Sequence, residues 1–334
     1  MILSKWCLIL GSGFGLYGYL PAVSECGYKV IIPARYRAKF ESRQELVIYS
    51  DTVHYIEDDE DIDSLTGNLD LLVIARRPSD QVDVLKLICD KHAINLPRKV
   101  ILEKPLAASP DEALEIWSHI SNDNSQMQFR MGYTFFYTVW GREVLKHLHS
   151  DEGCVISITW DFEAHHFTND IDTWKRYEQQ GGGALRFYGI QVIGLLASAA
   201  EWKPVESEMY ANDNDEDLEW NCVVVSGLHK VKVHIDSRSK RNGFGCVISR
   251  LDALDANSSV LYEYSNESPF DLSNKIDRDL RVDIIKKIVG SFDNPGSNIY
   301  TSSPNETCIG ASLKLWKAIE DCMVVRKVYR ESDN

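Results

Sequence analysis

An apolar run at residues 7–10 ends in the glycine-rich segment Gly11-Ser12-Gly13-Phe14-Gly15. A buried strand that turns through glycines into a helix brings bare backbone N–H groups up to a pyrophosphate. Gly11 permits the tight turn, and Gly13 leaves no Cβ to block the phosphates. The third glycine of the usual GxGxxG spacing falls on Leu16, so we expect Gly15 and Gly18 to let the first helix start slightly displaced. The segment predicts a dinucleotide site, and a strand–helix turn without a ligand is the alternative. The residues expected at the cofactor are Gly11, Gly13, Phe14 and Gly15.

Strand-like and helix-like segments alternate through the first third of the 334-residue chain. The expected strands are continuous apolar runs, which is typical of a parallel sheet with helices on both faces. The alternation therefore predicts an α/β Rossmann domain at the N-terminus. We expect strands at 7–10, 30–33, 47–49, 71–75 and 100–102, and helices at 15–26 and 80–92.

The pattern changes after a helix that begins beside Ser109 and ends near Ile120. Ser109 is its expected N-cap, and Glu112 completes a capping box. We place the domain boundary in the polar stretch that follows, so that a Rossmann domain spans 1–122 and a substrate-binding and oligomerisation domain spans 123–334. The second domain is expected to be α+β, with an open-faced, mostly antiparallel sheet. Its expected strands are 155–162, 207–210, 219–226, 230–235, 245–251 and 259–264, and its later helices are 279–292 and 306–325.

The chain has a formal net charge of −14. Nucleic acids and membranes are disfavoured as partners, because affinity for either comes mainly from Lys and Arg. The eight cysteines lack metal-like spacing, so we expect reduced core residues and no metal site. No segment is apolar enough to span a bilayer and the start shows no signal-peptide pattern, which predicts a cytoplasmic protein. The free face of the second sheet favours a homo-oligomer, a dimer or a tetramer.

Four short motifs, taken in order, carry a resemblance to a known family. They are 11–22, 73–75 with its following loop, Glu103-Lys104-Pro105, and Gly181-Gly182-Gly183-Ala184-Leu185. With this order and spacing, the chain resembles the glucose-fructose oxidoreductase and inositol dehydrogenase family (Gfo/Idh/MocA). The resemblance implies a Rossmann domain joined to an open-faced sheet domain. It also implies hydride transfer between a nicotinamide cofactor and a sugar, a cyclitol or a nucleotide-sugar.

Lys104 is the residue on which the resemblance and the local chemistry agree. It follows a buried strand at the carboxyl edge of the parallel sheet, where ligands bind in such folds. Its ammonium is suited to hold a substrate oxygen, to stabilise an alkoxide, or to relay a proton if burial lowers its pKa. The resemblance implies a cis peptide before Pro105. Glu103 and Lys104 are also expected at the cofactor. A surface lysine that caps a strand is the alternative.

The stretch after the glycine triplet departs from the family pattern. Family members commonly have an aspartate and, four residues later, a histidine, where this chain has Phe187 and Gln191. Phe187 does not exchange a proton, and Gln191 does not titrate near neutral pH. Three explanations stay open: Gln191 orients a substrate oxygen while the lysine transfers the proton; Tyr188, His165 or His166 supplies the acid or base; or the protein binds cofactor without catalysis.

The end of the second predicted strand carries Arg35, Arg37 and Lys39 but no acid. An NAD site usually has Asp or Glu there to bind the ribose 2′-OH. A guanidinium pairs with phosphate and stacks on adenine, so this segment favours NADP(H), with NAD(H) as the alternative. The simpler interpretation is that both arginines are the exposed start of a helix.

Further residues are assigned to the cleft from their place in the chain. The fourth predicted strand ends at Ala75, and the loop after it begins with Arg76 and Arg77. These three residues are expected beside the nicotinamide ribose and the pyrophosphate. Gln81 matches a position where many family members have a histidine. The segment Trp174-Lys175-Arg176 offers a flat surface and positive charge to a phosphorylated or nucleotide-bearing sugar, although a helix start with Trp174 in the core also explains it. The expected substrate contacts are Lys104, Tyr133, His165, Trp174, Lys175, Phe187 and Gln191.

These features together predict an NAD(P)-dependent oxidoreductase that acts on a CH–OH or keto group of a sugar-like substrate. The catalytic candidates are Lys104, Gln191, Tyr188 and His166. The alternative is a sensor or regulatory protein of the same fold that has lost dehydrogenase activity. The loss of two titratable positions favours that alternative, and the retained lysine opposes it.

Overall fold

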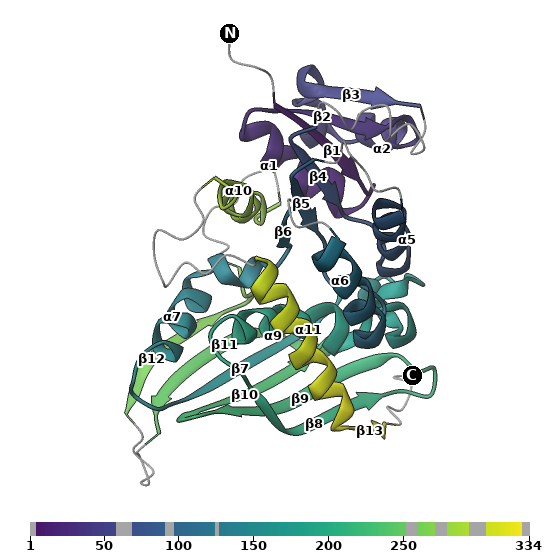
Figure 1. Ribbon diagram of the computed structural model, residues 1–334. Helices are drawn as coiled ribbons and strands as arrows, with labels where there is room; N and C mark the ends of the chain where they lie inside the picture. The colour runs from purple at the N-terminus through teal and green to yellow at the C-terminus, as the bar shows by residue number, and fades with distance from the viewer. Residues whose placement is uncertain are drawn as a thin grey trace.

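The protein has two β-sheets with helices between them (Figure 1). The computed structural model describes residues 5–57, 69–90, 97–123, 127–251, 259–270, 279–293 and 305–328. The first sheet is parallel, and the larger second sheet is mixed. This two-domain architecture is the one that the sequence predicts.

The first sheet has six parallel strands in the order β3-β2-β1-β4-β5-β6. β1 pairs with both β2 and β4, so the strand order reverses there. In such sheets a ligand site lies outside the carboxyl ends of the strands at this switch point. Every residue of β4 is buried, as expected for an apolar strand covered on both faces. The strands are β1 (Lys5–Leu10), β2 (Tyr28–Pro33), β3 (Val53–Ile56), β4 (Leu71–Ile74), β5 (Lys99–Leu102) and β6 (Gln128–Met131).

The strand predicted at 47–49 is wrong. Val47 is the last residue of the short helix α3 (Gln44–Val47), and residues 48 and 49 follow that helix. The strand that pairs with β2 is β3 instead. Leu46 is buried, whereas the side chains of Val47 and Ile48 are 42% and 75% exposed. A short apolar run does not distinguish a strand from a helix end, and here the fully buried residue, Leu46, precedes the predicted run.

Helices cover both faces of the parallel sheet. α5 and α6 lie on one side of it, and α1 and α10 lie on the other (Figure 1). α10 comes from late in the sequence and packs against α1. β6 pairs with β5, so the first sheet extends beyond the boundary predicted at residue 122. The elements around this sheet are η1 (Gly15–Tyr19), α1 (Leu20–Glu25), η2 (Ala34–Tyr36), α2 (Arg37–Glu41), η3 (Ser50–Thr52), α5 (Pro78–Asp90), α6 (Pro110–Asp123) and α10 (Val282–Gly290).

The second sheet has seven strands in the order β12-β11-β7-β10-β9-β8-β13. β7 with β10 and β8 with β13 are its parallel pairs, and the other pairs are antiparallel, as predicted. α7, α9 and α11 cover the face toward the first domain (Figure 1). The strands are β7 (Cys154–Glu163), β8 (Lys203–Ala211), β9 (Asp217–Ser226), β10 (His229–Asp236), β11 (Arg238–Arg250), β12 (Val260–Asn266) and β13 (Met323–Lys327). The helices and turns are η6 (Thr134–Tyr137), α7 (Val139–Leu148), α8 (His165–Thr168), η7 (Trp174–Arg176), η8 (Glu178–Gln180), η9 (Ala184–Gly189), α9 (Ile190–Ala197) and α11 (Glu306–Asp321).

The helix predicted at 306–325 ends earlier than expected. α11 stops at Asp321, and the following segment is β13, which pairs with the outer edge of β8. Val324 and Val325 are β-branched, and such residues suit a strand better than the last turn of a helix.

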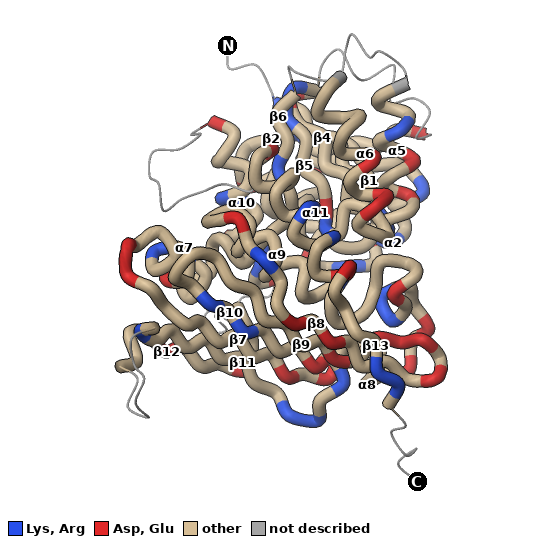
Figure 2. Tube along the Cα trace, turned by 60° about the horizontal axis from the view of Figure 1, so that its bottom comes forward, with Lys and Arg blue, Asp and Glu red and all other residues tan. Residues whose placement is uncertain are grey.

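Along the Cα trace, acidic and basic residues are interspersed in both domains (Figure 2). That distribution agrees with the net charge of −14. Among the described residues, no helix is long and apolar enough to cross a bilayer.

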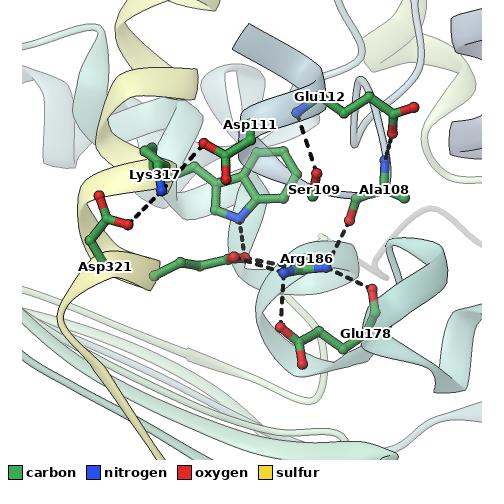
Figure 3. A network of polar contacts seen from close by, with 10 residues as sticks. Ala108, Ser109, Asp111, Glu112, Glu178, Arg186, Lys317 and Asp321 are labelled. Atoms are coloured by element: carbon green, nitrogen blue, oxygen red, sulfur yellow. Dashed lines mark hydrogen bonds and ion pairs between the residues drawn. The ribbon is translucent and has the colours of Figure 1, made fainter. Parts of the chain in front are cut away.

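A buried arginine ties the second domain to the segment that follows β5 (Figure 3). Arg186 donates to the two carboxylate oxygens of Glu320 at 2.7 Å each and pairs with Glu178 at 2.8 Å. Its Nη1 also donates to the Ala108 carbonyl oxygen at 2.9 Å. The indole of Trp316 donates to Glu320 at 2.6 Å. One guanidinium therefore joins η8, η9, α11 and the chain just before α6.

We expect the substitution Arg186→Met to lower the free energy of unfolding by roughly 3–5 kcal/mol, because it leaves the Glu320 carboxylate buried without its partner. Urea denaturation measures the loss. The matched control is Lys317→Met, which removes a partly exposed cation of the same region that pairs with Asp111 and Asp321. This control should unfold at nearly the wild-type urea concentration. Equal losses in the two variants would contradict the role given to Arg186.

Candidate functional site

A cavity of about 630 Å³ lies at the carboxyl ends of β1, β2, β4, β5 and β6. Its lining combines the glycine-rich loop of the first domain with residues of η7, η9 and α9 from the second. Most of the residues expected at the site line it, namely Gly11, Gly13, Phe14, Arg35, Ala75, Arg76, Arg77, Glu103, Lys104, Trp174, Lys175, Phe187 and Gln191. The remaining candidates, Gly15, Arg37, Tyr133, His165, His166 and Tyr188, are not among the lining residues.

The glycine loop has the geometry that a pyrophosphate needs. Gly11 has a φ of +146°, and a Cβ there would overlap the carbonyl oxygen of Ala75. A Cβ on Gly13 would meet nothing within 4 Å, so the backbone is open toward the cavity. On Gly15 a Cβ would lie 3.1 Å from Cγ2 of Ile9, which is the close helix–strand packing usually made by the third glycine of the motif. Leu16 is thus free to enter the core, where it is buried.

Gln81 holds the loop that carries Lys104. The peptide between Lys104 and Pro105 is cis, as the resemblance implies. Nε2 of the buried Gln81 donates to the carbonyl oxygens of Glu103, Pro105 and Leu106 at 2.7, 3.2 and 3.1 Å. Its Oε1 accepts from the Glu103 N–H at 3.1 Å. Gln81 therefore positions the loop, because its amide bonds are made to that backbone.

Lys104 points at Phe187 across the boundary between the domains. Its Nζ donates to the Phe187 carbonyl oxygen at 2.6 Å and lies 3.9 Å from the centroid of that ring. Burial is the largest of the effects that together lower the pKa of Lys104 to about 7; the charge of Glu103 opposes the shift, and the positive charges of Arg281 and Lys175 contribute to it. An amine with this pKa is able both to donate and to accept a proton near neutral pH.

Glu103 lies next to the lysine with both carboxylate oxygens engaged. Oε1 accepts from the hydroxyl of Tyr19 at 2.7 Å, and Oε2 accepts from the Lys104 N–H at 3.2 Å. Burial raises the pKa of this carboxyl, while the nearby positive charges and these hydrogen bonds hold it down.

Gln191 lines the cavity but also bonds to the backbone after β6. Its Oε1 accepts from the Thr134 N–H at 2.8 Å, and its Nε2 donates to the Gly132 carbonyl oxygen at 3.3 Å. The amide thus fixes the connection between the two domains. One N–H of Nε2 is left for a substrate oxygen.

The other acid/base candidates lie away from the cavity lining. The Tyr188 ring packs edge-on against Trp160 and Phe162, and burial raises the pKa of its hydroxyl far above the usual range. Burial lowers the pKa of His166 to about 4, and the charges of Lys175 and Arg176 add to the effect. His165 is exposed at the start of α8. Lys104 is therefore the one titratable catalytic candidate from the sequence that the described part of the structure places at the cavity.

Arg281 lines the cavity and was not found from the sequence. Its guanidinium lies 3.9 Å from the centroid of the Phe14 ring. Asp279 accepts from its Nε at 2.9 Å and from its Nη2 at 2.7 Å. The only signal in the sequence is an acid two residues before an arginine at the start of a predicted helix. That signal does not indicate that Arg281 lies near the glycine loop. Only the packing of α10 against the first domain brings the two together.

Basic side chains dominate the end of the cavity near β2. Arg35 and Lys39 line it, and Arg35 donates to the Tyr36 hydroxyl at 3.3 Å. Arg37 instead lies 4.1 Å from the centroid of the Tyr55 ring, outside the lining. Within the described ranges, no group of three or more His, Cys, Asp and Glu side chains is placed to hold a metal ion.

No protein-family model matches the chain, and no curated protein matches it in sequence. Solved structures do match it along nearly its whole length. The WlbA dehydrogenase from Chromobacterium violaceum, in complex with NADH and UDP-GlcNAcA, superposes with a TM-score of 0.70 at 11% identity over 96% of each chain.

Two further structures show the range of proteins that share this architecture. KijD10, a 3-ketoreductase from Actinomadura kijaniata in complex with NADP and TDP-benzene, has a TM-score of 0.64 at 13% identity and covers 98% of this chain and 100% of its own. A super-repressor mutant of Gal80p from Saccharomyces cerevisiae has a TM-score of 0.67 at 12% identity and covers 96% and 95%. The chain therefore has the two-domain fold of Gfo/Idh/MocA-type proteins, as its motifs predicted.

Proposed function

We propose that this protein is a nicotinamide-dependent oxidoreductase that transfers a hydride to or from a carbonyl or hydroxyl carbon of a sugar-like substrate. The observation that carries the proposal is the position of Lys104, whose ammonium lies in the same cavity as the open backbone of Gly13. The dinucleotide, when bound, supplies the hydride. WlbA and KijD10, whose structures hold nicotinamide cofactors and nucleotide-linked ligands, support this assignment by their shared fold.

In this mechanism, Lys104 acts on the reacting oxygen. Its ammonium polarises a carbonyl and donates a proton as the alkoxide forms, and in the opposite direction the neutral amine accepts the hydroxyl proton. Phe187 holds Nζ through its carbonyl oxygen and its ring face, so the amine is oriented before substrate binds. Gln191 offers its remaining N–H to a substrate oxygen. Neither role requires the aspartate and histidine that Phe187 and Gln191 replace.

A sensor that binds the cofactor without turnover is the second candidate. It is favoured by the lack of a titratable group at Phe187 and Gln191, and the Gal80p likeness shows that a protein described as a repressor shares the fold. Mixing the purified protein with NADPH and a panel of keto-sugars and nucleotide-linked keto-sugars separates the two candidates. Sustained loss of reduced-nicotinamide absorbance supports the enzyme. Tight binding without loss supports the sensor.

We further propose NADP(H) as the preferred cofactor and a homo-oligomer formed through the free face of the second sheet. Arg35 and Lys39 support the first proposal, because both line the cavity beyond β2, where a ribose 2′-phosphate is expected. The second proposal is supported by the sheet face opposite α7, α9 and α11, which no helix of the described residues covers (Figure 1). The cytoplasmic location stays a prediction from the sequence.

Replacing Lys104 by Met is expected to lower turnover by at least about 100-fold, because general acid–base and electrostatic assistance are both lost. The dissociation constant for NADPH should change little, since the glycine loop is intact. The variant Lys104→Arg keeps the positive charge but has no titration near neutral pH, so it separates polarisation from proton transfer. Turnover that survives in Lys104→Met would remove the lysine from the mechanism.

The low pKa of Lys104 predicts opposite pH profiles for the two directions of reaction. Carbonyl reduction needs the ammonium form, so kcat/KM should be constant at low pH and fall above about pH 7. Oxidation of the hydroxyl needs the neutral amine, so kcat/KM should rise with pH and level off above about pH 7. Steady-state rates across the pH range test both profiles. Two profiles that bend in the same direction would contradict this assignment.

The cofactor preference is tested by the substitution Arg35→Ser. Loss of a charge-assisted bond to a 2′-phosphate should weaken NADPH roughly tenfold or more and leave NADH nearly unchanged. Fluorescence titration measures both affinities. Arg37→Ser is the matched control, because Arg37 lies over Tyr55 outside the cavity lining. Tighter binding of NADH than of NADPH by the wild-type protein would overturn the NADP(H) assignment.

A further inference from the structure

Three cationic side chains from distant parts of the chain line the cavity together. The ammonium groups of Lys104 and Lys175 lie over the same ring, 3.9 and 5.0 Å from the centroid of Phe187. The guanidinium of Arg281 lines the same cavity, and its positive charge acts on both lysines. These side chains come from the loop after β5, from η7 and from the residue before α10. The fold therefore brings positive charge from three distant parts of the chain into one cavity.

The carboxylates nearby are already engaged. Asp279 forms a two-bond pair with Arg281, and both oxygens of Glu103 accept hydrogen bonds from Tyr19 and from the Lys104 backbone. Among the described residues, neither the Lys104 nor the Lys175 ammonium forms an ion pair with a carboxylate. Three cations thus face two carboxylates, which leaves an excess of positive charge in a chain whose net charge is −14.

Partly buried cations of like sign are costly unless an anion accompanies them. Phe187 contributes only a ring face and a carbonyl oxygen, and neither neutralises a charge. Lys175 is not needed to bind the cofactor phosphates, because the first domain offers the glycine loop and the cations beyond β2 for them. Trp174 and Phe187 of the second domain line the cavity beside these cations, so the substrate is the ligand left to supply an anion here.

We propose that the substrate carries an anionic oxygen group, a carboxylate or a phosphate, and that Lys175 and Arg281 bind this group while Lys104 binds the reacting oxygen. This inference rests on the proposed oxidoreductase function. The guanidinium offers a planar set of donors and the ammonium a point charge, a combination that suits a group with two or three equivalent acceptor oxygens. Lys175 and Arg281 are specificity-determining residues in this assignment.

The test compares ligands that differ at one carbon. NADPH-loaded protein is titrated calorimetrically with glucose, with glucuronate and with glucose 6-phosphate, which place a hydroxyl, a carboxylate and a phosphate at the same position. We expect at least one of the two anions to bind roughly tenfold or more tightly than glucose, as a charge-assisted hydrogen bond requires. Tighter binding of glucuronate assigns a carboxylate, and tighter binding of glucose 6-phosphate assigns a phosphate. Equal binding of all three would overturn the proposal.

Variants show whether these two residues are responsible. Lys175→Met and Arg281→Met should each reduce the preference for the anion roughly tenfold while the NADPH affinity stays close to wild type. Lys203→Met, which removes an exposed cation on β8, makes the same change in net charge and should leave the preference unchanged. A preference that survives in the double variant would contradict the proposal, as would a loss of NADPH binding in Arg281→Met.

The proposal and the function on which it rests fail in different ways. Failure to bind NADPH removes the oxidoreductase function itself. Binding of NADPH together with equal turnover of neutral keto-sugars and their carboxylate counterparts retains that function and removes the anionic subsite.

Discussion

A partly buried lysine ammonium between the two domains is the feature around which the cavity is arranged. Removing a charge from water is costly, so the groups packed against Lys104 must either interact with its charge or hold it in place. The carbonyl oxygen and ring face of Phe187 interact with the charge directly. Gln81 holds the loop, through bonds to the backbone on both sides of the lysine. The lowered pKa follows from this arrangement, because burial is its largest cause.

One short segment, η9, connects the stability of the protein to the geometry of its site. Arg186 bonds to the Ala108 carbonyl, and the next residue, Phe187, accepts from the side chain of Lys104. Both contacts reach the same stretch of chain after β5. The same short segment therefore fixes both the position of the second domain and the position of the Lys104 amine. A loss of the Arg186 network would disturb the site as well as the fold.

The distribution of charge separates the cavity from the rest of the molecule. The chain as a whole is strongly acidic, yet cations from both domains line the cavity and outnumber the acidic groups there. Clefts with one sign of charge and low-dielectric walls focus the electric field and raise the local concentration of the oppositely charged ligand. Such a cavity favours anionic ligands although the overall charge of the protein is negative.

The sequence alone determined the elements whose signals are local. Continuous apolar strands, the glycine turn and the motif around Lys104 predicted the parallel sheet, the open turn after β1 and the lysine at the sheet edge, because backbone geometry follows from neighbouring residues. It did not locate β3 or the end of α11, where a few apolar residues suit either a helix or a strand. Only the tertiary structure assigned Gln81 and Gln191 to backbone bonds and brought Arg281 to Phe14. Those contacts join segments far apart in the chain, and long-range packing leaves no periodic signal in the residues that make it.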